Sequence, residues 1–207
     1  MIPFKAVTVI VPPDLVVTSL DAPASATVGS SVLVSWTVTN QGEASTSSDW
    51  RDYIYLSDDE LLDNSDRQVT SVFTGSFAPL AAGGQYTINQ SVTIPSNVAL
   101  GPKFLLVAAD RFDQQGETDD TNNVRAKPID LVGSDLAPTA FTGPSEALMG
   151  QTVNFSWTVT NQGAFNALGS WRDTLYFSED AVLDAQDIDL TSVSRSNATV
   201  TPGGNYT

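Results

Sequence analysis

Hydrophobic and polar residues alternate along several short segments of the chain. Between residues 31 and 40, Val34, Trp36 and Val38 are separated by single polar residues. This two-residue period is typical of a β-strand that buries one of its faces. Residues 103–110, KFLLVAAD, are apolar on both faces, as expected of a strand in the middle of a sheet. No window shows a convincing helical period, and glycine, proline, serine, threonine, asparagine and aspartate interrupt the chain at short intervals.

Seven segments of this kind occupy the first 132 residues. We expect strands near residues 14–21, 31–40, 50–57, 67–74, 85–94, 103–110 and 124–132. Seven short strands in about 120 residues indicate an all-β, antiparallel β-sandwich of the immunoglobulin type. It would lack the disulfide of that type, because the chain has no cysteine. Trp36 is predicted to fill the core of this sandwich rather than to stack on a ligand.

The pattern is repeated further along the chain. The phrase SWTVTNQG occurs at residues 35–42 and at 156–163, and WRD occurs at 50–52 and 171–173, each pair 121 residues apart (156 − 35). A period of this length fits a whole domain rather than one unit of a solenoid. We therefore expect tandem immunoglobulin-like β-sandwiches.

The repeat also sets the expected domain boundaries. Residues 14–132 are predicted to form a complete sandwich, and residues 133–207 a second one that is truncated at its C-terminal strands. Residues 1–13 are either the last strand of a preceding repeat or a linker, because residues 4–13 align with 125–134 at the same offset. This organisation predicts a module that is strung in series.

Composition excludes several classes of function. The chain has 24 acidic and 9 basic residues, a net charge of −15, and neither histidine nor cysteine. It lacks the basic residues that displace counterions from nucleic acids, and no apolar run approaches the roughly 20 residues of a membrane helix. Without histidine or cysteine, Ser-His-Asp and Cys-His active sites and the usual zinc sites cannot form. We expect no nucleic-acid binding, no membrane insertion and no enzymatic activity.

Two acid-rich segments are candidate calcium sites. Calcium takes about six to eight oxygen ligands from carboxylates, amides and carbonyls on flexible loops. The first segment, SDDELLDNSD, has a second copy, SEDAVLDAQD, that keeps an acid at four places. The candidate ligands are Asp58, Asp59, Asp63 and Asp66 in the first copy and Asp180, Asp184 and Asp187 in the second, where Glu179 keeps the fourth charge. The segment is not an EF-hand, because the required glycine and terminal glutamate are absent.

The second acid-rich segment, ADRFDQQGETDDTNN, follows the sixth expected strand. In an immunoglobulin arrangement this strand ends at the pole where the third strand begins, which brings Asp110, Glu117 and Asp120 near Asp52. Asp52 shares its strand face with apolar residues, and a calcium ion at this pole would explain a carboxylate there. Alternatively, these loops are solvated turns in which aspartates cap backbone amides, and Asp52 pairs with Arg51 or another base.

The same segments resemble the CARDB family, the cell-adhesion-related domain found in bacteria. The resemblance rests on the order DLVVTSLDAPASATVGSSVLVSWTVTNQG, WRDYIYLSDDELLDNSD and FLLVAADRFDQQGETDDTNN. It covers nearly all of residues 14–131 and, in truncated form, 135–207. It implies an immunoglobulin-like module repeated within large secreted or surface-anchored proteins of bacteria and archaea, sometimes beside hydrolase domains. The family's closing segment has an acid, a later glutamate and an Asn-Asn pair, which Asp110, Glu117 and Asn122-Asn123 match.

Two functions compete on this evidence. The first is a non-catalytic, extracellular or cell-surface module that acts as an adhesive or structural spacer and is stabilised by Ca²⁺. Its partners would be neighbouring repeats of a longer chain and a cell-surface or matrix ligand. The alternative is an accessory domain that brings a secreted hydrolase to polysaccharide or protein. That function requires exposed aromatic side chains, which Tyr53 and Tyr55 supply, but the second copy has Thr174 and Tyr176 and keeps only half of the platform.

Overall fold

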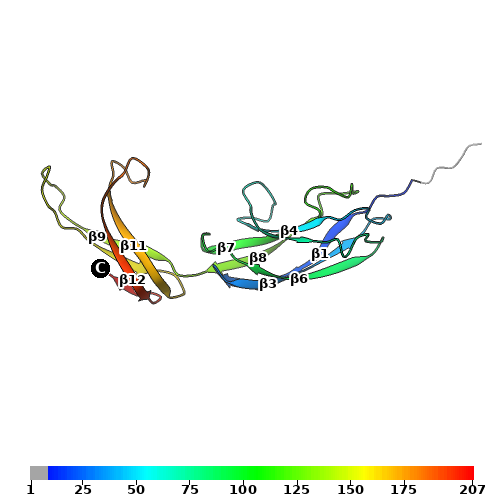
Figure 1. Ribbon diagram of the computed structural model, residues 1–207, viewed down its shortest axis with the longest axis horizontal. Coiled ribbons are helices and arrows are strands. Elements are labelled where there is room, and N and C mark those ends of the chain that lie inside the picture. Colours follow the sequence, from blue (N-terminus) through cyan, green and yellow to red (C-terminus); the bar gives the residue numbers. More distant parts are fainter. Residues whose placement is uncertain (1–8) are drawn as a thin grey trace, which may run out of the picture. The chain divides into compact units, whose positions relative to one another are not determined.

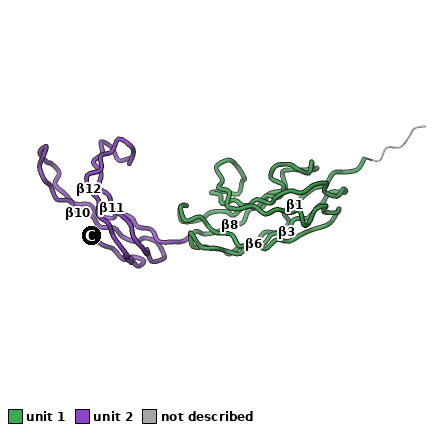
Figure 2. Tube along the Cα trace, in the orientation of Figure 1, with its two compact units in different colours: residues 1–131 green, residues 132–207 purple. Residues whose placement is uncertain are grey.

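The structure is a computed structural model that describes residues 9–207. The regular elements of this described part are β-strands (Figure 1). It contains no helix with the length and apolar character that a membrane crossing requires. The chain divides into two compact units, residues 1–131 and residues 132–207, which Figure 2 shows in different colours. We call them unit 1 and unit 2.

Unit 1 is a sandwich of two antiparallel sheets. One sheet has the strand order β1-β3-β6, and the other has the order β2-β8-β7-β4-β5. The strands are β1 (Leu15–Asp21), β2 (Ser25–Thr27), β3 (Ser31–Asn40), β4 (Arg51–Ser57), β5 (Arg67–Phe73), β6 (Gln85–Thr93), β7 (Gly101–Ala108) and β8 (Val124–Val132). This is an immunoglobulin-like arrangement, and the predicted fold class is confirmed.

The core of unit 1 lies between the two sheets. Trp36 and Trp50 are fully buried in it, and the pairing of β3 with β6 places Trp36 opposite Ile88. From the other sheet, β7 contributes Leu105 and Val107. Fully burying a large apolar side chain stabilises the fold by about 2 kcal/mol, so this cluster is a main source of stability. Trp36 has the core position that its strand pattern predicts.

β7 is the central strand that its two apolar faces predict. It pairs with β4 on one edge and with β8 on the other. Its alternate residues Leu106 and Ala108 are also buried, in a second apolar cluster with Tyr55. Ala108 lies opposite Tyr53, so β7 ends where β4 begins, as the immunoglobulin arrangement requires. Residues 109–123 then connect β7 to β8 at this pole of the sandwich, and we call them the closing loop.

The seven predicted strands occur with small shifts at their ends. β7 stops two residues early, and Asp110 just beyond it has a positive φ of 42°, which is incompatible with an extended strand. The short strand β2, which pairs with β8, was not predicted, because three residues are too few to show a period. Of the segment predicted over residues 1–13, residues 1–8 lie outside the described residues, and residues 9–13 carry no regular secondary structure.

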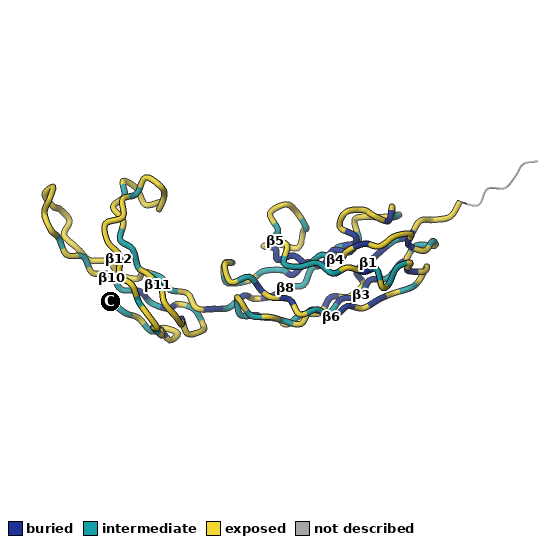
Figure 3. The backbone as a smooth tube through the Cα atoms, viewed as in Figure 1, coloured by how far each residue is buried: buried dark blue, intermediate teal, exposed yellow. Residues whose placement is uncertain are grey.

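Unit 2 contains a three-stranded sheet, β13-β10-β9, and a two-stranded sheet, β11-β12. The strands are β9 (Leu136–Thr142), β10 (Ser156–Asn161), β11 (Ala167–Phe177), β12 (Ile188–Val200) and β13 (Asn205–Tyr206). Figure 3 shows many buried segments in unit 1, whereas most of unit 2 is exposed. Trp157 and Trp171, which repeat Trp36 and Trp50 in the sequence, are only half-buried.

Candidate cation site at the closing loop

Asp52 is completely buried on the inner face of β4. Its carboxylate accepts a hydrogen bond from Trp36 Nε1 (2.7 Å), and the Tyr86 hydroxyl donates to both of its oxygens (2.8 and 2.9 Å). Trp50 Nε1 in turn donates to the Tyr86 hydroxyl (3.1 Å). These four side chains form a closed polar network inside an otherwise apolar core.

The donors of this network explain why a carboxylate occupies an apolar face. Burial raises the pKa of Asp52 to about 6, although the hydrogen bonds from Trp36 and Tyr86 oppose this change. Burial also raises the pKa of Tyr86 far above its ordinary value, so its hydroxyl remains a donor. A buried carboxylate is tolerated when such donors satisfy its oxygens. We therefore assign Asp52 to the core network. The alternative base, Arg51, instead donates to Ser71 (3.2 Å).

The first acid-rich segment forms an exposed loop in which three of the four predicted aspartates cap the backbone of the loop itself. Asp59 and Asp63 each accept a hydrogen bond from the amide two residues further on (2.8 and 2.7 Å). Asp66 accepts one from the amide of Asp63 (2.7 Å), and Asp58 forms an ion pair with Lys103. Each of these acids has a partner that a turn or an exposed surface normally supplies.

The second copy of this segment is capped in the same way. Asp180 and Asp184 accept hydrogen bonds from the amides two residues further on (2.7 and 2.8 Å), and Asp187 accepts one from the amide of Asp184 (2.8 Å). Aspartate is common in turns for this reason. Capping therefore accounts for three of the four acids that each copy retains, Asp58 and its counterpart Glu179 being the exceptions, without any cation.

The closing loop differs because two of its acids, Asp110 and Glu117, are buried or half-buried, whereas Asp120 is exposed. Asp110 is 4% exposed, and its Oδ2 accepts hydrogen bonds from the backbone amides four and five residues further on (2.8 and 2.9 Å). Glu117 accepts one bond from the amide of Leu15 (2.5 Å) and another from Asn123 Nδ2 (3.2 Å). The predicted grouping of acids at this pole thus involves specific contacts between the closing loop and the start of β1.

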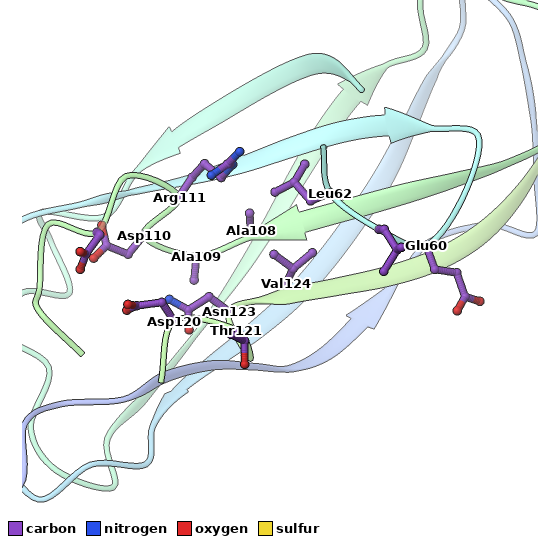
Figure 4. Close-up of a pocket in the computed structure, with 12 residues that line it drawn as sticks. Glu60, Leu62, Ala108, Ala109, Asp110, Arg111, Asp120, Thr121, Asn123 and Val124 are labelled. Carbon is purple, nitrogen blue, oxygen red and sulfur yellow. The ribbon is translucent and has the colours of Figure 1, made fainter. Parts of the chain in front are cut away.

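Three buried oxygens of the closing loop have no hydrogen-bond donor among the described residues. They are the Oδ1 atoms of Asp110, Asn122 and Asn123. Asp110 and Asn123 line one groove together with Asp120, and Figure 4 shows Asp110 and Asp120 pointing toward the same end of it. The amide of Ala109 donates to the Asn123 carbonyl (3.0 Å), which joins the two ends of the loop. Buried oxygens normally have a donor or a positive partner, so this group calls for a ligand.

Electrostatics at this loop also favours a cation. Burial, with a contribution from the charges of Asp110 and Asp120, raises the pKa of Glu117 to about 7, and burial raises the pKa of Asp110. A cation would relieve the repulsion between these charges. No three acidic side chains of the described residues form a metal-binding group by themselves. The oxygens available at this loop are therefore mixed, with carboxylates of Asp110 and Asp120 and the amide oxygen of Asn123 lining the groove and the amide oxygen of Asn122 beside it in sequence. Oxygen ligands of these kinds are the ones that hard cations take.

The structure separates the predicted ligands. Asp52 lies in the core network, and Asp110, Glu117 and Asp120 lie in the closing loop. Asp58 pairs with Lys103, and the remaining aspartates of both copies cap their own turns. Glu60, in the turn of residues 58–66, lines the far end of the groove in Figure 4. The unpartnered amide oxygens were missed as ligands. The Asn-Asn pair that closes the family motif was the one sequence signal for them, because neither alternation nor charge marks an amide.

Unit 1 is thus an immunoglobulin-like module with a polar network in its core and an oxygen-rich loop at one pole. The sequence profile of the CARDB family matches residues 12–127, which is more than half of the chain, and the chain belongs to this family. The CARDB domains that it matches are non-catalytic.

Several solved structures are similar to the chain. A crystal structure of a CARDB domain from Pyrococcus furiosus, in complex with di-metal ions, is 16% identical, with a TM-score of 0.45, and covers 64% of this chain and 100% of its own. A domain of a Methanosarcina acetivorans protein assigned to the cell surface is 18% identical, with a TM-score of 0.42, and covers 58% and 93%. A β-glucosidase from Listeria innocua is 15% identical, with a TM-score of 0.37, and covers 58% of this chain but 16% of the enzyme. No curated protein matches the chain.

Proposed function

We propose that unit 1 is a non-catalytic spacer module of an extracellular or cell-surface protein, and that it holds a calcium ion in its closing loop. The observation that carries this proposal is the set of unpartnered buried oxygens on Asp110, Asn122 and Asn123. They lie in the loop that joins β7 to β8, where a bound ion would stabilise the sandwich. Nothing in this arrangement requires a reacting substrate, which fits a structural role.

The repeated sequence supports an arrangement of such modules in series. Residues 14–132 and 133–207 carry two copies of the same strand pattern, with the second copy truncated relative to the first. In this role the partners are neighbouring repeats of a longer chain and a cell-surface or matrix ligand. A net charge of −15 suits a solvated, cation-binding stalk better than a surface that binds polyanions.

Unfolding with and without calcium tests the proposed site. At about 100 times its dissociation constant, a bound ion adds about 2.7 kcal/mol to the stability of the folded state. Peptides from β7 and β8 should then exchange their amide hydrogens more slowly in calcium than in EGTA, and the melting temperature should rise. Asp110→Asn should remove this response, whereas Asp63→Asn, in the self-capped loop, should keep it. Identical exchange and melting in calcium and EGTA would overturn the proposal.

An aromatic surface favours a second candidate function, that of an accessory domain that brings a secreted hydrolase to polysaccharide. Tyr53 and Tyr55 stack on the outer face of β4 with ring centroids 6.3 Å apart. Phe112 of the closing loop is 64% exposed and meets Tyr53 edge-on at 5.2 Å. Tyr55, however, is only 9% exposed and belongs to the buried cluster beside β7, so the aromatic surface of unit 1 consists of Tyr53 and Phe112 rather than of the two predicted tyrosines. Binding on a glycan array that is lost in Phe112→Ala would support this function, and no binding by the unaltered protein would reject it.

A further inference from the structure

The segment that leads into β1 lies against the closing loop. We call residues 9–14 the lead-in segment. The backbone amide of Thr118 donates to the Pro13 carbonyl (3.1 Å). Asn122 Nδ2 donates to the Asp14 carboxylate (3.0 Å). The closing loop thus holds the lead-in segment both by its backbone and by a side chain.

A second loop, the turn after β3, also holds this segment. Asn40 Oδ1 accepts a hydrogen bond from the amide of Asp14 (3.1 Å), and the amide of Gln41 donates to the Asp14 carbonyl (2.6 Å). A Cβ atom at Gly42 would overlap the Pro12 carbonyl, so this close approach requires glycine. The lead-in segment is therefore fixed by the turn after β3, and the closing loop adds a second attachment.

The asparagines of the closing loop link this attachment to the proposed calcium site. Asn122 uses its Nδ2 to hold Asp14, and Asn123 uses its Nδ2 to hold Glu117, which itself accepts the amide of Leu15. The Oδ1 atoms of both amides have no donor among the described residues. A side-chain amide carries its acceptor and its donors on opposite sides. A cation bound to the oxygens therefore fixes the orientation in which the nitrogens hold their partners.

We propose that calcium bound in the closing loop locks the lead-in segment onto unit 1, and so sets the stiffness of the chain at this point. The inference rests on the proposed calcium site and adds a regulatory role to it. Without the ion, the amides of Asn122 and Asn123 are held only by the hydrogen bonds of their Nδ2 atoms, and the charges of Asp110, Glu117 and Asp120 repel one another. Both changes loosen the loop and weaken its attachment to the lead-in segment, which the turn after β3 still holds.

Unit 2 provides an internal control. The segment that leads into β9 is held by the turn after β10, because the amide of Asp135 donates to Asn161 Oδ1 (2.9 Å) and the amide of Gln162 donates to the Asp135 carbonyl (2.6 Å). The amide of Phe165 also donates to the Gly133 carbonyl (3.2 Å). The described strands of unit 2 include no counterparts of β7 and β8, and so no closing loop between them. Calcium should therefore not change the mobility of the segment that leads into β9.

Single spin labels test the lock in the full chain, because the sequence contains no cysteine. One label is placed at Ile10→Cys, a position that is 68% exposed. The matched control label is placed at the exposed Ser134→Cys in unit 2. Calcium should lengthen the rotational correlation time of the label at position 10 about twofold relative to EGTA, and should leave the label at position 134 unchanged.

Asp14→Ala separates the lock from the calcium site. This change removes the carboxylate that accepts Asn122 Nδ2 but keeps all three unpartnered oxygens. Calcium affinity, measured by calorimetry and terbium competition, should stay within about threefold of the original, while the label at position 10 should lose most of its response. If the unaltered protein binds calcium and the label at position 10 does not respond, the lock is overturned and the calcium site stands. If it binds no calcium, both are overturned.

Discussion

The two units carry the same polar network in different surroundings. In unit 1, Trp36 and Asp52 are fully buried and joined by a 2.7 Å hydrogen bond. In unit 2, the corresponding Trp157 and Asp173 are half-buried, and the hydrogen bond from Trp157 Nε1 to the Asp173 carboxylate is longer, at 3.4 Å. Tyr206 still donates to Asp173 (3.0 Å), as its counterpart does in unit 1. Both units therefore form the same polar network, but its side chains are buried in unit 1 and only half-buried in unit 2.

The difference lies in the strands that cover the network. In unit 1, β7 and β8 bring Leu105, Val107 and Ile129 into the core beside the tryptophans. The described strands of unit 2 include no counterpart of β7 or β8. Apolar side chains there are more exposed, with Leu190 at 51% and Val193 at 38%, whereas Val69 and Val72, which lie 121 residues earlier, pack against the core of unit 1. The comparison teaches that local pairs of strands are enough to align the polar groups, whereas burial requires strands from much later in the sequence.

The test with the largest expected effect removes the central tryptophan from each unit. Trp36→Ala should lower the unfolding free energy of unit 1 by about 4 kcal/mol, because it leaves a cavity in a closed core and removes the Trp36 Nε1 donor of the buried Asp52. Trp157→Ala should lower that of unit 2 by about 2 kcal/mol or less, since water already reaches its surroundings. Hydrogen exchange, measured separately for peptides of each unit in the full chain, gives both values. Equal losses in the two units would contradict the comparison.

A second test uses pH. The pKa of Asp52 is about 6 in the folded state, and its ordinary value is 3.8, so folded unit 1 binds more protons than the unfolded chain between these values. Its unfolding free energy should therefore fall as pH rises through this interval, by about 3 kcal/mol at most. Asp52→Asn should flatten this part of the profile. The raised pKa values of Asp110 and Glu117 act in the same direction and should leave a residual slope. A profile unchanged by Asp52→Asn would show that burial does not perturb this carboxyl.

Much of this architecture could be predicted from sequence, because strand periodicity is a local property. The alternation in residues 31–40 located β3, and the doubly apolar KFLLVAAD located the central strand. The grouping of Asp110, Glu117 and Asp120 followed from the order of strands in the fold. The partners of Asp52 could not be predicted, since Trp36 and Tyr86 lie 16 and 34 residues away and no period encodes a hydrogen bond. The unpartnered amide oxygens likewise depend on side-chain orientation, which only the packed loop defines.

A third test concerns a feature that is alike in both units. Asn40 and Asn161 are fully buried, and the amide of each makes four hydrogen bonds to the turn around it. Every partner lies in or near the neighbouring strands. The lower burial of unit 2 should therefore not change the contribution of this asparagine to stability. Asn40→Ala and Asn161→Ala should each lower the stability of their unit by about 2 kcal/mol. Unequal losses would show that the cover also strengthens this turn.

The smallest expected effect comes from the self-capped acidic loops. Asp63→Ala and Asp184→Ala each remove an acceptor for the amide two residues further on, at a fully solvated site. Each change should lower the melting temperature slightly and by the same amount. The hydrogen bonds from Ser65 lower the pKa of Asp63 below its ordinary 3.8, so its capping contribution is present above that pH and lost as pH falls further. The difference between Asp63→Ala and the unaltered protein should vanish in strong acid and should not depend on calcium. If this difference did depend on calcium, the cation would bind at this turn rather than in the closing loop.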